Sequence, residues 1–262
     1  MPSNVSLFEQ RFNEYARTFA GPDGSYVFPV RRKIEHTFDV CRISGILAGR
    51  SAFAEKDVFL FHLCALFHDV SRFEQYQKFG TFLDAASFDH GNRSAELVTE
   101  HGFLRELDEK DRRIILTAIR FHNKPRIPDD CPEEALAAAR MVRDADKLSI
   151  LTIIWEFFTD PEKSDPAIKL SLPDTPGFTP EVLDAVMHGK PVLYSSFRCV
   201  NDFIITLFSW TEDLNYPAAA SFALENRLYE KLGTLLPAGP EADRIRKITK
   251  NRLEKAAEAC LS

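Results

Sequence analysis

The sequence predicts an all-α protein. Apolar residues recur at a spacing of about 3.6 residues through nearly the whole chain. No segment shows the sustained two-residue alternation that is typical of half-buried strands. The helical pattern breaks where glycine and proline gather, at residues 21–24, 123–132, 160–180, 189–191, 217 and 237–240. These breaks divide the chain into helices of ordinary length.

Two histidines lie on the apolar faces of expected helices. His36 heads an apolar stripe at positions 40, 43 and 47, and His122 closes one at positions 115, 118 and 119. This spacing is that of a helix face turned towards a core. Both imidazoles are therefore expected to point inward.

Two further polar side chains share a face with apolar residues. A helix is expected to open at His90, after Ser87 or Asp89 as its N-cap, with positions 94 and 97 on the same face. Asp146 lies in a long helical run over residues 133–158 and shares a face with positions 142 and 153.

The doublet His68-Asp69 ends an apolar run over residues 61–69. An imidazole and a carboxylate side by side suit a divalent ion. A single histidine on an apolar face is more often a hydrogen-bonded core residue. Six polar side chains in such positions would be costly without a shared partner. We therefore expect the six to converge on metal.

Over residues 31–150 the chain resembles the HD-domain metal-dependent phosphohydrolases, whose pattern is a His, a His-Asp doublet and a distant Asp. The resemblance places this pattern on His36, His68-Asp69 and Asp146. The terminal Asp of the family sits in an Ala-Asp-x-Leu context, as Asp146 does here. Asp144 is the alternative, and only one of the two can be a ligand because residues two apart lie on nearly opposite helix faces.

His90 and His122 resemble the two extra histidines of the binuclear branch of this superfamily. The resemblance implies two divalent ions (manganese, iron, magnesium or nickel) and a metal-activated water that attacks phosphorus. It implies that Asp69 bridges the ions. The first ion would be held by His36, His68, Asp69 and Asp146, and the second by His90, His122 and Asp69.

Several basic residues are candidates for substrate contact. Arg72 matches the basic residue that HD-GYP proteins carry three positions after the doublet, and this implies a bidentate phosphate contact. Asp69 and Arg72 are thus the expected catalytic residues. Lys124 and Arg143 each lie within a turn of an expected ligand and are further candidates for substrate binding.

The segment that follows the doublet has two interpretations. Thr81 and Asp84 would fix a loop that covers the metals, since loops next to a site commonly carry function. An ordinary capped turn around Gly80 is the alternative.

The resemblance implies a hydrolase acting on a small phosphomonoester or phosphodiester, nucleotides included. His122 is followed by Asn-Lys-Pro-Arg instead of the His and Gly-Tyr-Pro loop of HD-GYP proteins, and the acidic pair of stringent-response alarmone hydrolases is missing after Asp69. Cleavage of cyclic dinucleotides, the HD-GYP reaction, and hydrolysis of stringent-response alarmones are therefore not supported. Mixed-valent di-iron oxygenases with an HD domain share the six-ligand pattern and are the alternative function. A non-enzymatic module that metals stabilise is a third hypothesis.

Composition predicts a soluble cytoplasmic protein. The five cysteines are odd in number and lack Cys-x-x-Cys spacing, which argues against a disulfide framework and a zinc ribbon. There is no basic and then apolar leader, and no run approaches the roughly 18 apolar residues of a membrane span. The net charge of −6 disfavours a broad nucleic-acid surface. It is compatible with a small anionic phosphate-bearing substrate, which metals and Arg72 would meet locally.

The proline-rich stretch at 160–180 predicts a division of the chain. Residues 1–160 would form the HD domain with an N-terminal helix, and residues 161–262 a C-terminal helical extension packed on the HD core. Helices are expected over residues 180–188, 199–214, 217–236 and 241–259. Three roles are open to the aromatic residues of the extension: packing on the core, lining a pocket, or forming a homodimer contact.

Overall fold

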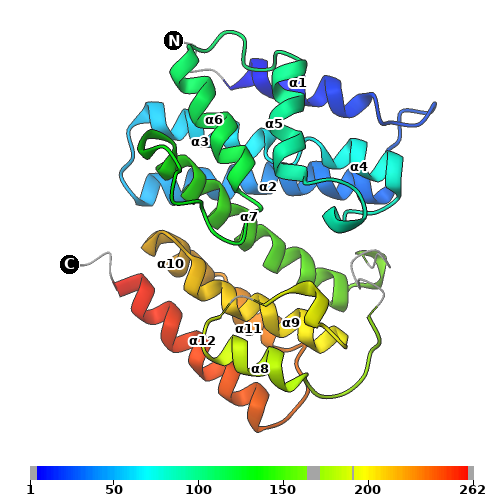
Figure 1. The fold of residues 1–262 in the computed structure, drawn as a ribbon, viewed down its shortest axis with the longest axis vertical. Coiled ribbons are helices and arrows are strands. Elements are labelled where there is room, and N and C mark those ends of the chain that lie inside the picture. Colours follow the sequence, from blue (N-terminus) through cyan, green and yellow to red (C-terminus); the bar gives the residue numbers. More distant parts are fainter. Residues whose placement is uncertain (1–4, 164–171, 191, 259–262) are drawn as a thin grey trace. The chain divides into compact units, whose positions relative to one another are not determined.

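The computed structural model describes residues 5–163, 172–190 and 192–258 (Figure 1). Every regular element in these ranges is an α-helix or a 3₁₀ turn, so the all-α prediction is confirmed. None of the described helices is both long and apolar enough to cross a membrane. The chain divides into two units, residues 1–146 and 147–262, and the division falls inside one long helix, α7.

The first unit is built around helix α3. Its elements are α1 (Ser6–Arg17), α2 (Phe28–Arg50), α3 (Glu55–Phe67), α4 (Arg72–Phe79), η1 (Asp84–Ala86), α5 (His90–Glu100), α6 (Glu109–Phe121) and the first part of α7 (Glu133–Thr159). Helices α1, α2, α5 and α6 all pack against α3. Because neighbours cover it on several sides, the run at 61–67 is apolar nearly all round and lacks a polar face.

Local sequence signals set the helix boundaries around the doublet. Asp89 caps α5 and accepts a hydrogen bond from Asn92 N at 3.0 Å, so it is Asp89 and not Ser87 that acts as the N-cap. Asp108 caps α6 in the same way. Helix α4 ends at Gly80, whose φ of 65° lies in the left-handed region that favours glycine. These boundaries place residues 68–71 and 90 at helix ends.

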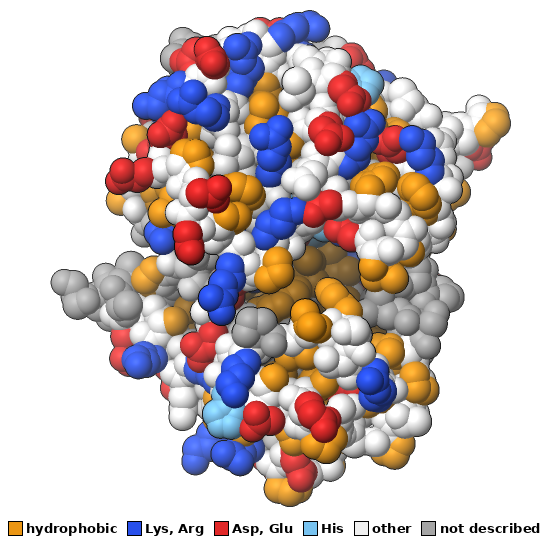
Figure 2. All heavy atoms as spheres, in the orientation of Figure 1, with side chains coloured by type: hydrophobic (Ala, Val, Ile, Leu, Met, Phe, Trp, Pro, Cys, Tyr) orange, Lys and Arg blue, Asp and Glu red, His pale blue; other side chains and the backbone are white. Residues whose placement is uncertain are grey.

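Aromatic side chains fasten α1 to the first unit. Phe12 is fully buried and lies edge-on or tilted against Phe38, Phe67 and Phe73, with ring centroids 5.7–6.5 Å apart. Arg11 donates a hydrogen bond to Phe103 O at 2.7 Å and pairs with the carboxylate of Glu106. Figure 2 shows Lys and Arg side chains spread over the face of the first unit where α5 and α6 lie.

The second unit is also helical. After η2 (Pro161–Lys163) it contains α8 (Pro180–Met187), η3 (Tyr194–Ser196), α9 (Val200–Ser209), η4 (Trp210–Asp213), α10 (Pro217–Glu225), α11 (Leu228–Gly233) and α12 (Pro240–Glu258). The helix predicted over 217–236 is interrupted at Arg227, which has a φ of 55°. The predicted end at Ala259 lies outside the described residues. Asp202 accepts hydrogen bonds from Thr179 N and Arg198 N, both at 2.8 Å, and so joins the start of α9 to the start of α8.

The Arg11–Glu106 pair predicts a dependence of stability on acid. The hydrogen bond from Arg11 lowers the pKa of Glu106 to about 2, from an ordinary value of 4.5. The contribution of the pair is therefore complete above about pH 4.5 and is lost as the pH falls towards 2. We expect the free energy of unfolding to fall less steeply over this range in Glu106→Gln than in the wild type, measured by urea titration. Glu181→Gln, which removes an exposed carboxylate, is the control; equal slopes in all three proteins would contradict the prediction.

Candidate metal centre

Six side chains of the first unit converge on one point: His36, His68, Asp69, His90, His122 and Asp146. His68 and His122 are the C-cap residues of α3 and α6, and His90 is the first residue of α5. His36 and Asp146 come from the middle of α2 and α7. All are buried except Asp146, whose side chain is 15% exposed. The structure thus brings the whole predicted set together.

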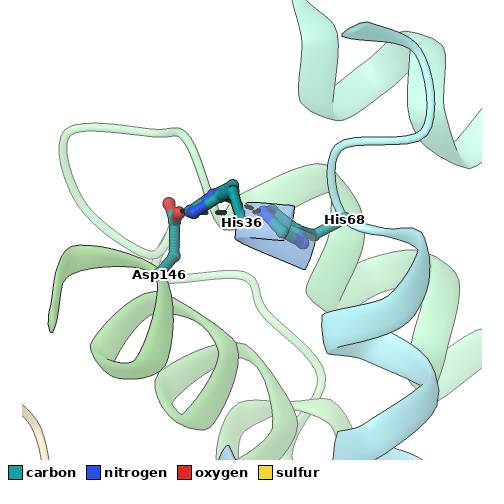
Figure 3. A group of neighbouring side chains, drawn as sticks. All are labelled: His36, His68 and Asp146. Atoms are coloured by element: carbon teal, nitrogen blue, oxygen red, sulfur yellow. Dashed lines mark hydrogen bonds and ion pairs between the residues drawn. The ribbon is translucent and has the colours of Figure 1, made fainter. Parts of the chain in front are cut away.

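The first group consists of His36, His68 and Asp146 (Figure 3). One ligand atom from each lies within 4.8 Å of the other two. His36 Nε2 is 3.0 Å from Asp146 Oδ1 and 3.4 Å from His68 Nε2. Oδ2 of Asp69 adjoins the group, at 3.7 Å from His36 Nε2 and 3.5 Å from His68 Nε2.

A second group is formed by His68, Asp69 and His122, and His90 adjoins it. The Nε2 atoms of His90 and His122 are 3.1 Å apart. Oδ1 of Asp69 lies 3.5 Å from His90 Nε2 and 3.7 Å from His122 Nε2. The carboxylate of Asp69 therefore directs one oxygen to the first group and the other to the His90–His122 pair.

Hydrogen bonds orient three of the four imidazoles. The Nδ1 atom of His68 lies 2.7 Å from Ala65 O, and that of His122 lies 2.7 Å from Ile119 O. The Nδ1 atom of His90 lies 2.6 Å from Asp84 Oδ2. Since each acceptor requires a hydrogen on Nδ1, a neutral ring presents an unprotonated Nε2 to the centre. Such outer contacts are the usual support of metal-binding histidines.

The donor set fits divalent metal. The Nε2 atoms of His90 and His122 lie 3.1 Å apart, so in the neutral tautomers with hydrogen on Nδ1 their lone pairs face each other, and a cation between them would relieve this repulsion. Asp146 Oδ1 is buried and lies 3.0 Å from His36 Nε2, but it accepts no hydrogen bond from the residues that the structure describes. Imidazole nitrogen with carboxylate oxygen suits manganese, iron, nickel or zinc.

The electrostatics of the centre set the protonation of its ligands. Burial, aided by the charge of Arg72, lowers the pKa of His90 to about 3, so its imidazole is neutral at neutral pH. Although burial opposes it, Lys33 and His68 hold the pKa of Asp69 well below its ordinary value. Against the lowering effect of burial, Asp69 raises the pKa of His68, so a proton competes with metal for this ring.

Two cations flank Asp69. Lys33 Nζ lies 2.6 Å from Asp69 Oδ2, and Arg72 Nε donates to Asp69 Oδ1 at 3.3 Å. Lys33 is not among the predicted site residues. It precedes His36 by about one turn of the same helix, and this spacing places both side chains on one helix face. The guanidinium of Arg72 also lies 3.1 Å from His90 Nε2 and donates to Asp84 Oδ1 at 3.0 Å.

Asp84 belongs to the support of the centre. Its carboxylate joins His90 to Arg72 and also accepts a hydrogen bond from Gln75 Nε2 at 3.1 Å. The segment after Gly80 therefore lies against the ligands, and Gly80 itself forms the capped turn that ends α4, so features of both interpretations are present. Thr81 has a local role, because its hydroxyl accepts a hydrogen bond from Leu83 N at 3.1 Å.

The two other predicted substrate contacts, Lys124 and Arg143, bind other groups of the first unit. Lys124 pairs with Asp89, the N-cap of the helix that His90 opens. Arg143 is buried and donates to four backbone carbonyls at 2.6–3.4 Å, those of residues 121, 122, 124 and 125, so it anchors the segment between α6 and α7. Neither position supports the predicted substrate contact.

Of the two acidic candidates in α7, Asp144 and Asp146, the geometry favours Asp146, because its carboxylate is grouped with His36 and His68.

Close packing of α5 on α6 holds His90 against His122. A Cβ atom on Gly91 would lie 2.5 Å from Asn123 Oδ1 and 3.0 Å from Arg120 O. Only glycine allows this approach, which is tighter than ordinary van der Waals contact permits for any other residue.

Gly91→Ala should therefore separate His90 from His122. We expect a variant that folds with a loss of about 1–3 kcal/mol and that retains less metal than the wild type, measured by unfolding and by elemental analysis. Gly45→Ala in α2 is the matched control, because a Cβ there meets nothing within 4 Å. Metal content equal to wild type in Gly91→Ala would refute this role of the glycine.

Comparison with known proteins agrees with this centre. Residues 34–151 match the family model of the HD domain, and the matched range contains all six converging side chains. Searches of curated proteins and of solved structures found no match. The resemblance noted in the sequence is thus confirmed over residues 34–151, and this part of the chain is an HD domain.

Proposed function

We propose that this protein is a metal-dependent phosphohydrolase with a binuclear centre, acting on a small phosphomonoester or phosphodiester. The observation that carries the proposal is the carboxylate of Asp69. One of its oxygens is directed to His36 and His68 and the other to His90 and His122. This is the arrangement that a carboxylate bridging two ions requires.

The two ion positions follow from these contacts. His36, His68, Asp146 and Asp69 would hold one ion, and His90, His122 and Asp69 the other. Bound divalent ions supply Lewis acidity to a phosphoryl group and lower the pKa of water that they coordinate. The protein's own side chains keep the imidazoles oriented through Ala65, Ile119 and Asp84.

The cations beside Asp69 support an anionic substrate. Lys33 Nζ and the guanidinium of Arg72 lie 5.5 and 5.8 Å from the ring centroid of Phe82. Arg72 is engaged by several acceptors of the protein, including Phe82 O at 2.6 Å, and its best-supported role is to position Asp69, Asp84 and His90. Lys33 pairs with Asp69 and retains 19% exposure. We therefore infer that Lys33 contacts the substrate phosphate and that any contact from Arg72 is secondary.

The di-iron oxygenase hypothesis uses the same six ligands. Oxygenation needs a redox metal, whereas hydrolysis does not. Lys33, the more exposed of the two cations beside the carboxylate of Asp69, favours the hydrolase, because its charge suits a phosphate group. Metal identity and the assay below decide between the two functions.

The proposal is tested by turnover of phosphate esters. Chain loaded with manganese, magnesium, nickel or iron should release phosphate or alcohol from small monoesters or diesters. Lys33→Met should raise KM about tenfold or more at unchanged metal content, since a hydrogen bond to a charged group contributes about 1.5–3 kcal/mol. Lys247→Met, an exposed lysine of α12, is the control. Oxygen consumption by the iron-loaded chain without ester hydrolysis would replace the hydrolase by the oxygenase.

Variants of the ligands test the division into two ions. Asp69→Ala should lose both ions, because its carboxylate serves both positions, and His122→Ala should chiefly lose the second. Elemental analysis of chain purified without chelator measures this directly. Equal and full metal content in the two variants would eliminate the bridging assignment.

A further inference from the structure

A cavity lies in the first unit, away from the six converging side chains. It has a volume of about 450 Å³ and lies between α5, α6 and the segment that joins them. None of its lining residues belongs to the metal centre. Its size is within the range of pockets that take small organic molecules, roughly 300–1,000 Å³.

The cavity is basic although the chain is acidic. Four arginines and one glutamate line it, in a protein whose net charge is −6: Arg105, Arg112, Arg113, Arg120 and Glu109. Arg105 and Arg113 pair with Glu106 and Glu134, both on the outside of the unit. Within the described part of the chain, neither Arg112 nor Arg120 has a hydrogen-bonded or ionic side-chain partner. Two guanidinium groups beside one cavity are therefore available to an anion.

An unpartnered hydroxyl also lines the cavity. Thr117 is only 9% exposed, and its hydroxyl makes no hydrogen bond within the described residues. A hydroxyl that meets a cavity without a protein partner is free to donate to a ligand or to water. Val98, Leu104 and Leu116 give the same cavity an apolar surface.

We propose that this cavity binds a small organic phosphate, a molecule with one phosphate group and an apolar body. Arg112 and Arg120 would hold the phosphate oxygens, which match the planar fork of a guanidinium. Thr117 would donate its hydroxyl to the ligand, and the apolar body would lie against the valine and leucines. The site is independent of the proposed hydrolase activity. Since α5 and α6 also carry His90 and His122, a ligand here would bind the two helices that form the second half of the metal centre.

Isothermal titration calorimetry on the full chain tests the proposal, with phenyl phosphate as the probe and inorganic phosphate as the comparison. Chelator is present in every titration, and the wild-type titration is repeated on Lys33→Met. Binding at the metal centre is thereby separated from binding in the cavity. We expect phenyl phosphate to bind more tightly than inorganic phosphate. The double variant Arg112→Gln, Arg120→Gln should weaken the binding at least tenfold, and Arg244→Gln, an exposed arginine of α12, should leave it unchanged.

The role of the hydroxyl is tested separately. Thr117→Val should weaken phenyl phosphate binding several-fold, and Thr117→Ser, which keeps the hydroxyl, should restore it. Absence of binding by the wild type, or equal binding by the wild type and the double arginine variant, would overturn the proposal.

Discussion

The buried carboxylate of Asp69 is the constraint around which the first unit is organised. A carboxylate that is only 3% exposed is costly unless positive charge or hydrogen-bond donors surround it. Lys33 and Arg72 supply the charge, and four imidazoles face its two oxygens. A cluster of this kind is stable only if several helices deliver side chains to one point, which is what α2, α3, α5, α6 and α7 do.

The ends of α3 and α6 place and orient two of the four imidazoles. His68 and His122 follow the last turns of α3 and α6, where backbone carbonyls lack partners within the helix. Their Nδ1 atoms donate to two of those carbonyls, of Ala65 and Ile119, so each helix end satisfies its own backbone while it orients a ligand. The electronegative C-terminal ends of both helices also favour a cation at the centre. The start of α5 contributes differently, through the carboxylate of Asp84 beside His90.

The sequence predicts the helical fold class and the set of converging side chains. The positions that it does not predict have physical causes. The helical class and the convergence of six side chains followed from apolar periodicity, because a polar residue on an apolar face must find a partner inside. Lys33 was overlooked because it ends a basic triplet that is typical of a solvated face. Arg143 is a predicted substrate contact, but closeness in sequence to a ligand does not tell whether an arginine faces a cleft or backbone carbonyls. The helix break at Arg227 contains no glycine or proline, so the sequence gives no signal for it.

The central claim is that Asp69 bridges two ions, and anomalous diffraction tests it most directly. Crystals would be grown from chain purified anaerobically without chelator or added metal, with data collected on both sides of the absorption edge of the metal found in them. The account predicts two anomalous peaks, one beside His36, His68 and Asp146 and one beside His90 and His122, with Asp69 between them. A single peak, or two peaks that Asp69 does not join, would contradict it.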